Sequence, residues 1–379
     1  MRIAHLCLSN WYVDGVGYQE NELVREHVSA GHEVLVVAST ETHSKAGGLT
    51  HTVPGAYVGD EGARIIRLPY RKILPRSVMA KIRANHGVNK VLEDFKPDSI
   101  LFHGTCGWEL LTVAAYVKKN PNVIFYVDSH EDPYNSARTW LSREILHKQF
   151  YARILRSALP EIRKILCYSP ESVEFVHSVY RIGRSHLELY PLGGHPVADE
   201  EYFKARERIR RQYSLADDDV LIVQSGKQTE RKKLLLAIRS FKQCLDSNLR
   251  FYVCGSISSN IETEVLQSSC SDPRICFLGW KSFDELTSLL CAADVYLQPG
   301  TQSVTMQHSL CCRCAVILDD VPSHRMYVQK NGWLIGRDGS LDEIIREIPA
   351  SNLDEMKMRS YRFSRDVLDY KILAKRVFE

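Results

Sequence analysis

The stretch from Pro299 to Leu318 reads PGTQSVTMQHSLCCRCAVIL, and it predicts the most informative corner of the fold. An apolar run at 293–297 leads into it, and a second apolar run begins at Ala315. Between these two expected strands lie a turn rich in hydroxyl groups and a helix of small residues. The N–H groups in the first turn of a helix lack partners within the helix and attract anions. The stretch therefore predicts an α/β fold with a phosphate-binding turn.

Length and composition indicate a globular protein of two domains. A chain of 379 residues is longer than one typical hydrophobic core supports. Its contents of 44% hydrophobic and 25% charged residues are ordinary for globular proteins. The net charge of +3 is too small to indicate a nucleic-acid partner. No apolar run in the sequence approaches the ~20 residues of a membrane span.

The first residues and the cysteines favour the cytoplasm. The opening, MRIAHLCLS, reads as a strand rather than as a secretion signal. The eleven cysteines are scattered and mostly lie in apolar runs, so we expect buried thiols rather than disulfides. Cys311, Cys312 and Cys314 are close enough to suggest a metal site, but no second Cys/His pair stands at zinc-finger spacing, and we expect no metal. Where a membrane matters, we expect the protein to lie on its inner face.

The first half alternates between expected strands and helices. Its opening strand, turn, helix and strand form a β-α-β unit, which implies a parallel sheet. Residues 40–63, rich in glycine, threonine and histidine, predict a long loop. Tyr70 to Lys90 is basic and partly amphipathic, and two interpretations stand: a solvated helix face, or a surface for anionic lipid headgroups. The expected strands are 2–8, 33–38, 64–68, 99–102, 123–127, 165–167 and 187–190, and the expected helices are 18–30, 142–157 and one that opens at 169–172.

Candidate site residues in this half follow the expected strands. Gly15 and Gly17 stand in the turn after the first strand, where a phosphate-binding turn and a plain tight turn both fit. Ligands of open α/β sheets gather outside the carboxyl ends of the strands. A polar cluster there favours a site, although any one member alone could be a structural hydrogen-bonding group. The polar residues after the strands at 99–102 and 123–127 are His103, Asp128, His130 and Asp132.

A second β/α half begins after the sequence PLGGHP at 191–196, which predicts the domain boundary. The strand at 220–224 leads into SGKQTERKK at 225–233 and then into an apolar helix. Gly226 followed by two lysines five apart, Lys227 and Lys232, suits a diphosphate, and an exposed run of charge is the alternative. Two more expected strands end at Gly255 and Gly279. We expect the site in a cleft between the two halves. The other expected helices are 199–213, 284–293, 341–348 and 355–378.

Several pieces of the sequence, in their order and spacing, resemble the retaining glycosyltransferases of family four, which have the GT-B fold. The resemblance covers nearly the whole length. It implies an α/β architecture of two Rossmann-like domains that face each other across a cleft, with the last helix crossing back to the first domain. The implied limits are 1–195 for an acceptor-binding domain, 196–358 for a nucleotide-sugar-binding domain and 359–379 for the C-terminal helix. The pieces are GVGYQENELVREHVSAGHEVLVVAS (15–39), RIIRLPY (64–70), SILFHG (99–104), ELYPLGGHP (188–196), SGKQTERKK (225–233), FLGW (277–280), ADVYLQPGTQSVTMQHSLCCRCAVIL (293–318) and NGWLIG (331–336).

The resemblance also implies roles for individual residues. Lys227 and Lys232 match the family's basic pair on the diphosphate, with Lys227 in place of an arginine, and His130 lies where many members place a histidine near the transferred sugar. No metal and no cofactor beyond the nucleotide-diphosphate-sugar itself is implied. The expected catalytic residues are His130, Lys227 and Lys232; the expected donor-binding residues are Gly15, Val16, Gly17, Gly226, Gly255, Trp280, Gln302, Ser303, Val304, Thr305 and His308; and the expected acceptor-binding residues are Tyr18, Gln19, His103 and Asp132.

The opening stretch departs from the family's pattern at His308. When the stretch is anchored on AVI at 315–317, the second of two family glutamates falls on His308, and the first has no equivalent. The sequence QSVTM at 302–306 resembles a subset of the family that normally keeps the second glutamate to hold the ribose hydroxyls. A neutral histidine makes one hydrogen bond to ribose where a carboxylate makes two. Arg313, at the position of the family's glycine, is either an extra cation beside the site or a solvent-facing helix residue.

The resemblance implies transfer of a hexose, with retention, from a nucleotide-diphosphate-sugar to a hydroxyl of a glycan or lipid-linked glycan, as in the assembly of cell-surface polysaccharides or glycoconjugates. The two lysines and the backbone N–H groups would neutralise the departing diphosphate without a metal. Two alternatives stay open: a nucleotide-sugar 2-epimerase of the same fold, and a partner subunit that has kept the fold and lost catalysis. The missing glutamates motivate the partner subunit.

Overall fold

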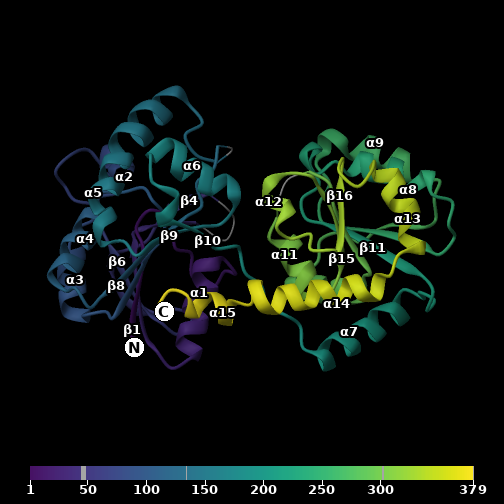
Figure 1. Cartoon of the computed structure of the whole chain (residues 1–379), viewed down its shortest axis with the longest axis horizontal. Helices are drawn as coiled ribbons and strands as arrows, with labels where there is room; N and C mark the ends of the chain where they lie inside the picture. Colours follow the sequence, from purple (N-terminus) through teal and green to yellow (C-terminus); the bar gives the residue numbers. More distant parts are fainter. Residues whose placement is uncertain (44–47, 134, 301–302, 379) are drawn as a thin grey trace. The chain divides into compact units, whose positions relative to one another are not determined.

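The computed structural model describes residues 1–43, 48–133, 135–300 and 303–378. The chain divides into two compact units (Figure 1). The first contains Met1–Pro191 together with the C-terminal segment from Tyr370 onward, and the second contains Leu192–Asp369. Within the described residues no helix is both long enough and apolar enough to span a membrane.

The first unit is built on an eight-stranded sheet in the order β10-β9-β8-β7-β1-β2-β6-β5. Every pair of neighbours in it is parallel except β5 and β6. The prediction of a parallel sheet is confirmed. Its strands are β1 (Arg2–Cys7), β2 (Glu33–Ser39), β5 (Gly55–Val58), β6 (Arg64–Leu68), β7 (Ser99–Phe102), β8 (Ile124–Ser129), β9 (Lys164–Cys167) and β10 (Leu187–Leu189).

Helices pack against the apolar strands of this sheet, and buried side chains from strands and helices form a large hydrophobic cluster and a smaller one around β1, β2, β6 and α1. Central strands of a parallel sheet are covered on both faces, which explains their nearly continuous apolar runs. The helical elements are α1 (Gln19–Ser29), α2 (Arg76–Ile82), α3 (Val88–Phe95), α4 (Glu109–Lys119), η1 (Ser142–Tyr151), α5 (Ala152–Ala158), η2 (Leu159–Glu161), α6 (Pro170–Tyr180), η3 (Arg184–His186) and α15 (Tyr370–Lys375).

The predicted loop at 40–63 is wrong for three short segments. β3 (Glu41–His43) pairs antiparallel with β4 (Leu49–His51), and β5 pairs antiparallel with β6 at the edge of the main sheet. All four residues of β5 are exposed, so no alternation of apolar and polar residues marks it as a strand. The backbone of β6 supplies the pairing, and a single-sequence pattern does not reveal such a partner.

The second unit contains a six-stranded, fully parallel sheet in the order β13-β12-β11-β14-β15-β16. Its strands are β11 (Val220–Ser225), β12 (Leu249–Cys254), β13 (Ile275–Phe277), β14 (Val295–Gln298), β15 (Ala315–Asp319) and β16 (Gly332–Ile335). Two buried clusters, one on each face, cover this sheet. The helical elements are α7 (Asp199–Gln212), η4 (Glu230–Lys232), α8 (Leu234–Gln243), α9 (Ser259–Ser269), α10 (Phe283–Ala292), α11 (Val304–Cys311), α12 (Pro322–Arg325), α13 (Leu341–Glu347), η5 (Ile348–Ala350), α14 (Leu353–Phe363) and η6 (Ser364–Leu368).

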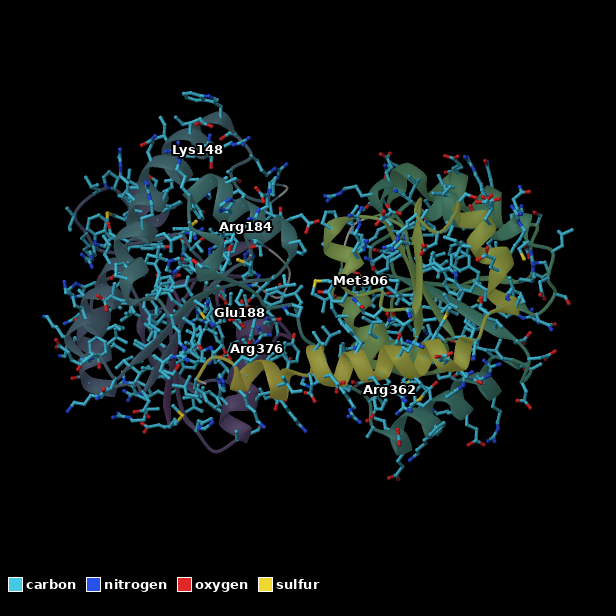
Figure 2. All side chains as sticks on the ribbon, viewed as in Figure 1. Lys148, Arg184, Glu188, Met306, Arg362 and Arg376 are labelled. Atoms are coloured by element: carbon cyan, nitrogen blue, oxygen red, sulfur yellow. The ribbon has the colours of Figure 1, made fainter. Side chains whose placement is uncertain are left out.

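The predicted helix at 355–378 is interrupted. After α14 and the π-helical η6, Asp369 leaves helical geometry with φ −59° and ψ 121°, and the chain joins the first unit from Tyr370 onward. The side chains of Tyr190 and Ser99 donate hydrogen bonds to the carbonyls of Leu373 (2.8 Å) and Val377 (2.6 Å). Arg376 pairs with Glu188 (Figure 2). These contacts tie the C-terminal segment to the first unit.

Candidate functional site

Three glycines end neighbouring strands of the second unit and form one backbone edge. The N–H of Gly226 donates to the carbonyl of Cys254 (2.9 Å), and the N–H of Gly255 donates to the carbonyl of Gly279 (2.8 Å). Gly255 has φ +118°, and a Cβ on it would stand 2.0 Å from the carbonyl oxygen of Gly226. Gly226 itself has φ +101° and open space where a Cβ would lie. Glycine is therefore required at 255 by close approach, and the edge beside Gly226 is open.

The turn after β11 carries the two lysines predicted to face a diphosphate. Lys227 is exposed, whereas Lys232 is only 9% exposed within η4. Burial, with the nearby Arg231, lowers the pKa of Lys232 to about 8. The next residue, Lys233, forms an ion pair with Asp319 at 2.5 Å. The turn thus places one accessible cation and one largely desolvated cation at the carboxyl end of the sheet, where ligands of such folds bind.

A framework of buried amides fixes this turn. Gln224 donates from Nε2 to the side-chain oxygen of Gln228 (3.0 Å) and to the carbonyl of Lys232 (3.0 Å). Gln228 in turn donates to the carbonyl of Gly226 (3.1 Å). Gln224 and Gln228 are not among the predicted site residues. The available signal was a glutamine at the end of an otherwise apolar buried strand, as in VLIVQS and VYLQ.

The turn that opens α11 meets η4 directly. A Cβ on Gly300 would stand 1.9 Å from the carbonyl oxygen of Arg231, so the backbones touch at this point. Ser303 occupies the N-cap position of α11, but its hydroxyl donates to Oε1 of Gln298 (2.6 Å) and does not cap the helix. Val304 and Thr305 stand in the first turn of α11, and helix N-termini in general attract anions. Gln302 lies outside the described residues.

His308 lies within α11 and faces α10. It is 6% exposed, its Nε2 is 2.7 Å from Oγ1 of Thr287, and its ring packs 4.6 Å from that of Phe283, centroid to centroid. Thr287 already donates its proton to the carbonyl of Phe283 (2.8 Å), so Nε2 of His308 is the donor and Nδ1 an acceptor. Burial, with His195 as a minor cause, lowers the pKa of His308 to about 4. The imidazole is therefore neutral at pH 7.

Trp280 and the three clustered cysteines have contrasting environments. Trp280 follows Gly279 directly and is 72% exposed, as an open aromatic platform at the same edge of the sheet.

Cys311, Cys312 and Cys314 are fully buried in the core of the second unit. Among the described residues, no group of three or more His, Cys, Asp or Glu side chains is arranged to hold a metal ion.

Both interpretations of Arg313 are wrong. It is 5% exposed and has φ +68°, directly after α11. Its guanidinium lies over the rings of Tyr361 (4.0 Å) and Tyr202 (4.2 Å) and pairs with Asp199. Two aromatic faces and a carboxylate compensate the buried charge. Arg313 therefore joins α7 and α14 to the end of α11 and is neither a solvent-facing residue nor a cation beside the turn.

In the first unit, the glycine turn between β1 and α1 is largely exposed. Gly15 has φ +69°, and a Cβ on it would meet the Asp60 carboxylate at 2.3 Å. Val16 is half-buried, Gly17 is exposed, and Tyr18 is 55% exposed. Gln19, by contrast, is buried and directs its Nε2 to the carbonyl of Pro191 (3.4 Å). The backbone of the turn is open, but a carboxylate stands next to it.

Three of the four polar residues predicted after β7 and β8 form one cluster: His103 and His130 lie beside Asp128. His103 donates to Oδ2 of Asp128 from Nδ1 (2.6 Å), and His130 Nε2 lies 3.8 Å from the other carboxylate oxygen. His103 is fully buried and its second ring nitrogen contacts His5, so it supports Asp128 and does not offer a surface to an acceptor. Asp132 closes a turn with the backbone N–H of Asn135 (2.8 Å). His130, with a side chain 40% exposed, is the member that remains accessible.

Comparisons with known proteins agree with the division of the chain into two units. Residues 13–193 match the model described as Glycosyltransferase Family 4, and residues 205–362 match the model described as Glycosyl transferases group 1. Among curated proteins, none matches the sequence significantly.

Solved structures show the same fold at low identity. HepE of Anabaena in complex with UDP has 13% identity and a TM-score of 0.66, and the match covers 100% of this chain and 98% of that one. Sucrose-phosphate synthase of Thermosynechococcus elongatus has 15% identity and a TM-score of 0.63, with 99% and 96% covered. WaaG, a glycosyltransferase of lipopolysaccharide biosynthesis, has 15% identity and a TM-score of 0.61, with 99% and 98% covered. In chain order the sequence thus matches a Glycosyltransferase Family 4 model and a Glycosyl transferases group 1 model, and the fold of the chain is GT-B.

Proposed function

We propose that the protein transfers a sugar, with retention of configuration, from a nucleotide-diphosphate-sugar to a hydroxyl of a glycan or lipid-linked glycan. The observation that most directly supports this function is the turn after β11. There the largely buried ammonium group of Lys232 and the exposed ammonium group of Lys227 stand beside the open edge at Gly226. The N-terminus of α11 adjoins this turn through Gly300 and Arg231. The domain matches and the UDP in the HepE structure support a nucleotide sugar as the donor.

The chemistry follows from where negative charge develops. When the bond between the sugar and the diphosphate breaks, charge grows on the departing phosphate oxygens. Lys232 is desolvated, so its charge acts there with little screening, and the N–H groups of the α11 N-terminus add to it. These groups require no metal for neutralisation. The exposed ring of Trp280 offers a stacking surface for the base of the donor. His130, beside Asp128, is the candidate to position the transferred sugar.

A thermal-shift panel over UDP-, GDP-, ADP- and dTDP-sugars tests this proposal directly. A bound donor raises the apparent stability by mass action, and UDP-sugars stand first in the panel because HepE holds UDP. We expect one nucleotide class to raise the midpoint by several degrees, and radiolabelled sugar to be released or transferred on addition of a lipid-linked acceptor. The absence of a shift with every donor would exclude the function.

A catalytically inactive partner subunit is the second candidate, because His308 takes the place of a carboxylate. His308 is already hydrogen-bonded to Thr287, and burial lowers the pKa of its imidazole to about 4, so the neutral ring offers ribose at most the lone pair of Nδ1. A His308→Glu variant separates the two cases. Stronger donor binding and faster transfer in the variant indicate a degenerate site, whereas weaker binding and transfer show that histidine is the group this site uses.

We further propose that the first unit docks on an anionic membrane surface. α2, η1 and the segments before them expose large apolar side chains between basic ones. Sedimentation with vesicles of phosphatidylcholine, with and without 30% phosphatidylglycerol, tests this: we expect binding to the anionic vesicles that weakens with salt. Equal binding to both vesicles, or none, contradicts it. The exposed apolar residues are Ile73, Leu74, Val78, Trp140, Leu141 and Ile145, and the neighbouring exposed cations are Lys72, Arg76, Arg138 and Arg143.

A further inference from the structure

Five groups in the first unit form one continuous line of hydrogen bonds, which we call the histidine chain. It runs from Asp128 through His103, His5 and His27 to the carbonyl of Ala374 in α15. Oδ2 of Asp128 lies 2.6 Å from Nδ1 of His103, and Nε2 of His103 lies 3.0 Å from Nδ1 of His5. Nε2 of His5 lies 2.9 Å from Nδ1 of His27, and Nε2 of His27 lies 2.8 Å from the carbonyl oxygen of Ala374. All four side chains are at most 1% exposed, so bulk water does not replace any of these partners.

The two ends of the histidine chain decide how many protons it holds. A carbonyl oxygen only accepts, so His27 must donate from Nε2 and accept at Nδ1. His5 must then donate from Nε2 and accept at Nδ1, and His103 must donate from its own Nε2. Four hydrogen bonds need four protons, and three neutral imidazoles supply three of them. One further proton is therefore required between His103 and Asp128.

The environment of Asp128 assigns this proton to His103. The carboxylate also accepts from the N–H of Gly104 (2.8 Å) and from the hydroxyl of Tyr168 (3.2 Å), and several donors around one carboxyl group favour its ionised form. Burial works to lower the pKa of His103, but the charge and hydrogen bond of Asp128 outweigh burial and raise that pKa. Burial works to raise the pKa of Asp128, and His103 more than offsets this effect, so that pKa is lowered.

We propose that His103 is a positioning residue that carries a buried positive charge at neutral pH, and that the contact of α15 with His27 is what keeps the charge there. The charge holds Asp128 ionised, and Asp128 in turn fixes the left-handed turn at Gly104 (φ +97°) and faces His130. If the Ala374 carbonyl is lost as an acceptor, His27 and His5 can both reverse their tautomers. His103 then needs a single N–H, and the extra proton is no longer required.

Other titratable groups surround the histidine chain and enter any experiment on pH. Glu20 on α1 adds to the raised pKa of His103. Burial first, and then the neighbouring imidazoles, hold the pKa of His5 well below its usual value, and burial lowers the pKa of His27 to about 4. Between pH 6 and 9 both therefore stay neutral. Cys7, Tyr168 and Tyr190 also face the histidine chain, and burial raises the pKa of each well above its usual value. His130 lies beside Asp128, His32 lies beside His27, and the N-terminal amine lies beside His32.

Long-range ¹H–¹⁵N spectra of the histidine rings in the full-length protein test the proton count without reference to catalysis. At pH 7.5 we expect both ring nitrogens of His103 to be protonated, and His5 and His27 to be protonated at Nε2 alone. The ¹³C shift of the Asp128 carboxyl group is expected to be that of a carboxylate. A neutral His103 at this pH, or a protonated Asp128, overturns the proposal.

Two variants of His27 test the role of α15. His27→Phe removes the donor toward Ala374 and the acceptor toward His5, so we expect the imidazolium pattern of His103 to disappear at pH 7.5. His27→Gln is the matched control, because its amide N–H can donate to Ala374 while its oxygen accepts from His5, and we expect it to retain the pattern. The Gly104 amide signal reports in both whether the native contact with Asp128 persists. An imidazolium that survives in His27→Phe contradicts the coupling to α15.

Stability against pH gives a second readout that remains available if His27→Phe folds poorly. Since the pKa of His103 is raised on folding, its contribution to stability is complete below the unfolded value near 6.5 and is lost as the pH rises through the folded value. We expect the wild-type unfolding free energy to fall on this alkaline side, and His103→Gln to show a smaller fall, because the buried cysteine and tyrosines contribute equally in both proteins. An alkaline loss of equal size in both proteins would contradict the assignment of the proton to His103.

Discussion

The carbonyl oxygen of Gly226 lies 2.0 Å from the place that a Cβ on residue 255 would occupy. Two strands that are neighbours in the sheet but far apart in sequence thus bring their terminal turns into backbone contact. The same edge continues through the hydrogen bond from Gly255 to the carbonyl of Gly279 (2.8 Å). Any side chain at 255 must displace the turn that carries Lys227 and Lys232.

Gly255→Ala should therefore weaken donor binding strongly. The substitution adds a clash with backbone and backbone strain of roughly 1–3 kcal/mol at φ +118°. We expect the variant to have a lower unfolding midpoint than the wild type, and its donor-induced thermal shift to be less than half of the wild-type shift. Gly279→Ala is the matched control, because Gly279 has φ +65° and open space around the Cβ position. It should lose some stability and keep the donor shift; equal donor shifts in the two variants would show that the contact at Gly226 is unimportant.

Lys232→Ala should lower the rate of transfer by ~100-fold or more, the usual effect of removing one donor that stabilises developing charge. Initial rates at saturating donor measure this. Lys233→Gln serves as the control within the same turn, because Lys233 is exposed and paired with Asp319, and its transfer rate should stay close to that of the wild type. Near-normal transfer by Lys232→Ala would exclude its assignment to the diphosphate.

The pH profile should report the same ammonium group. Burial lowers the pKa of Lys232 to about 8, so the free enzyme loses this positive charge as the pH rises through 8. We expect kcat/KM to fall about tenfold per pH unit on that side, because kcat/KM follows the ionisation of the free enzyme. Lys232→Arg, which stays charged, should lack this limb. An identical alkaline limb in both enzymes would assign it to another group.

His308→Gln should remove part of the acid sensitivity of folding. The pKa of His308 is lowered to about 4 by burial, so the unfolded state takes up more protons below pH 6.5 and stability falls as the pH drops from 6.5 toward 4. At pH 4.5 this amounts to about 2–3 kcal/mol. Urea unfolding at pH 7 and pH 4.5 measures the loss, which should be smaller in the variant by that amount. His27→Gln is an independent comparison, since burial also lowers the pKa of His27 to about 4. Parallel losses in wild type and His308→Gln would show that the imidazole is accessible to protons in the native state.

Arg313→Met should destabilise the second unit by about 2 kcal/mol and leave the donor-induced thermal shift unchanged. The reason is the loss of the guanidinium between the rings of Tyr202 and Tyr361. Asp199→Ala removes the exposed partner of the same ion pair, whose side chain is 73% exposed, and should change stability by ~0.5 kcal/mol or less. A loss of donor binding in Arg313→Met would place this cation in the site after all.

The sequence predicted most strands of both sheets, because each central strand of a parallel sheet is a short apolar run. Ser99 to Phe102 is predicted residue for residue, and the interrupted C-terminal helix is the clearest error among the helices. β5 is exposed on every residue, and its pairing with β6 leaves no pattern in its own sequence. The break at Asp369 is set by the passage of the chain from one unit to the other, which local helix propensity does not encode.

For the site, the residue types and the strand ends at which they stand are readable from the sequence alone: Gly226 with its two lysines, and the polar residues after β7 and β8. Their position follows from chain order, because the carboxyl ends of parallel strands share one edge. The tertiary structure decided what each side chain can do. Partners brought from distant elements bury Lys232 and His308, enclose Arg313 between two rings and link His103 to both Asp128 and His5. Charge state depends on burial and on the nearest donors and acceptors, and those are properties of the folded packing and not of the local sequence.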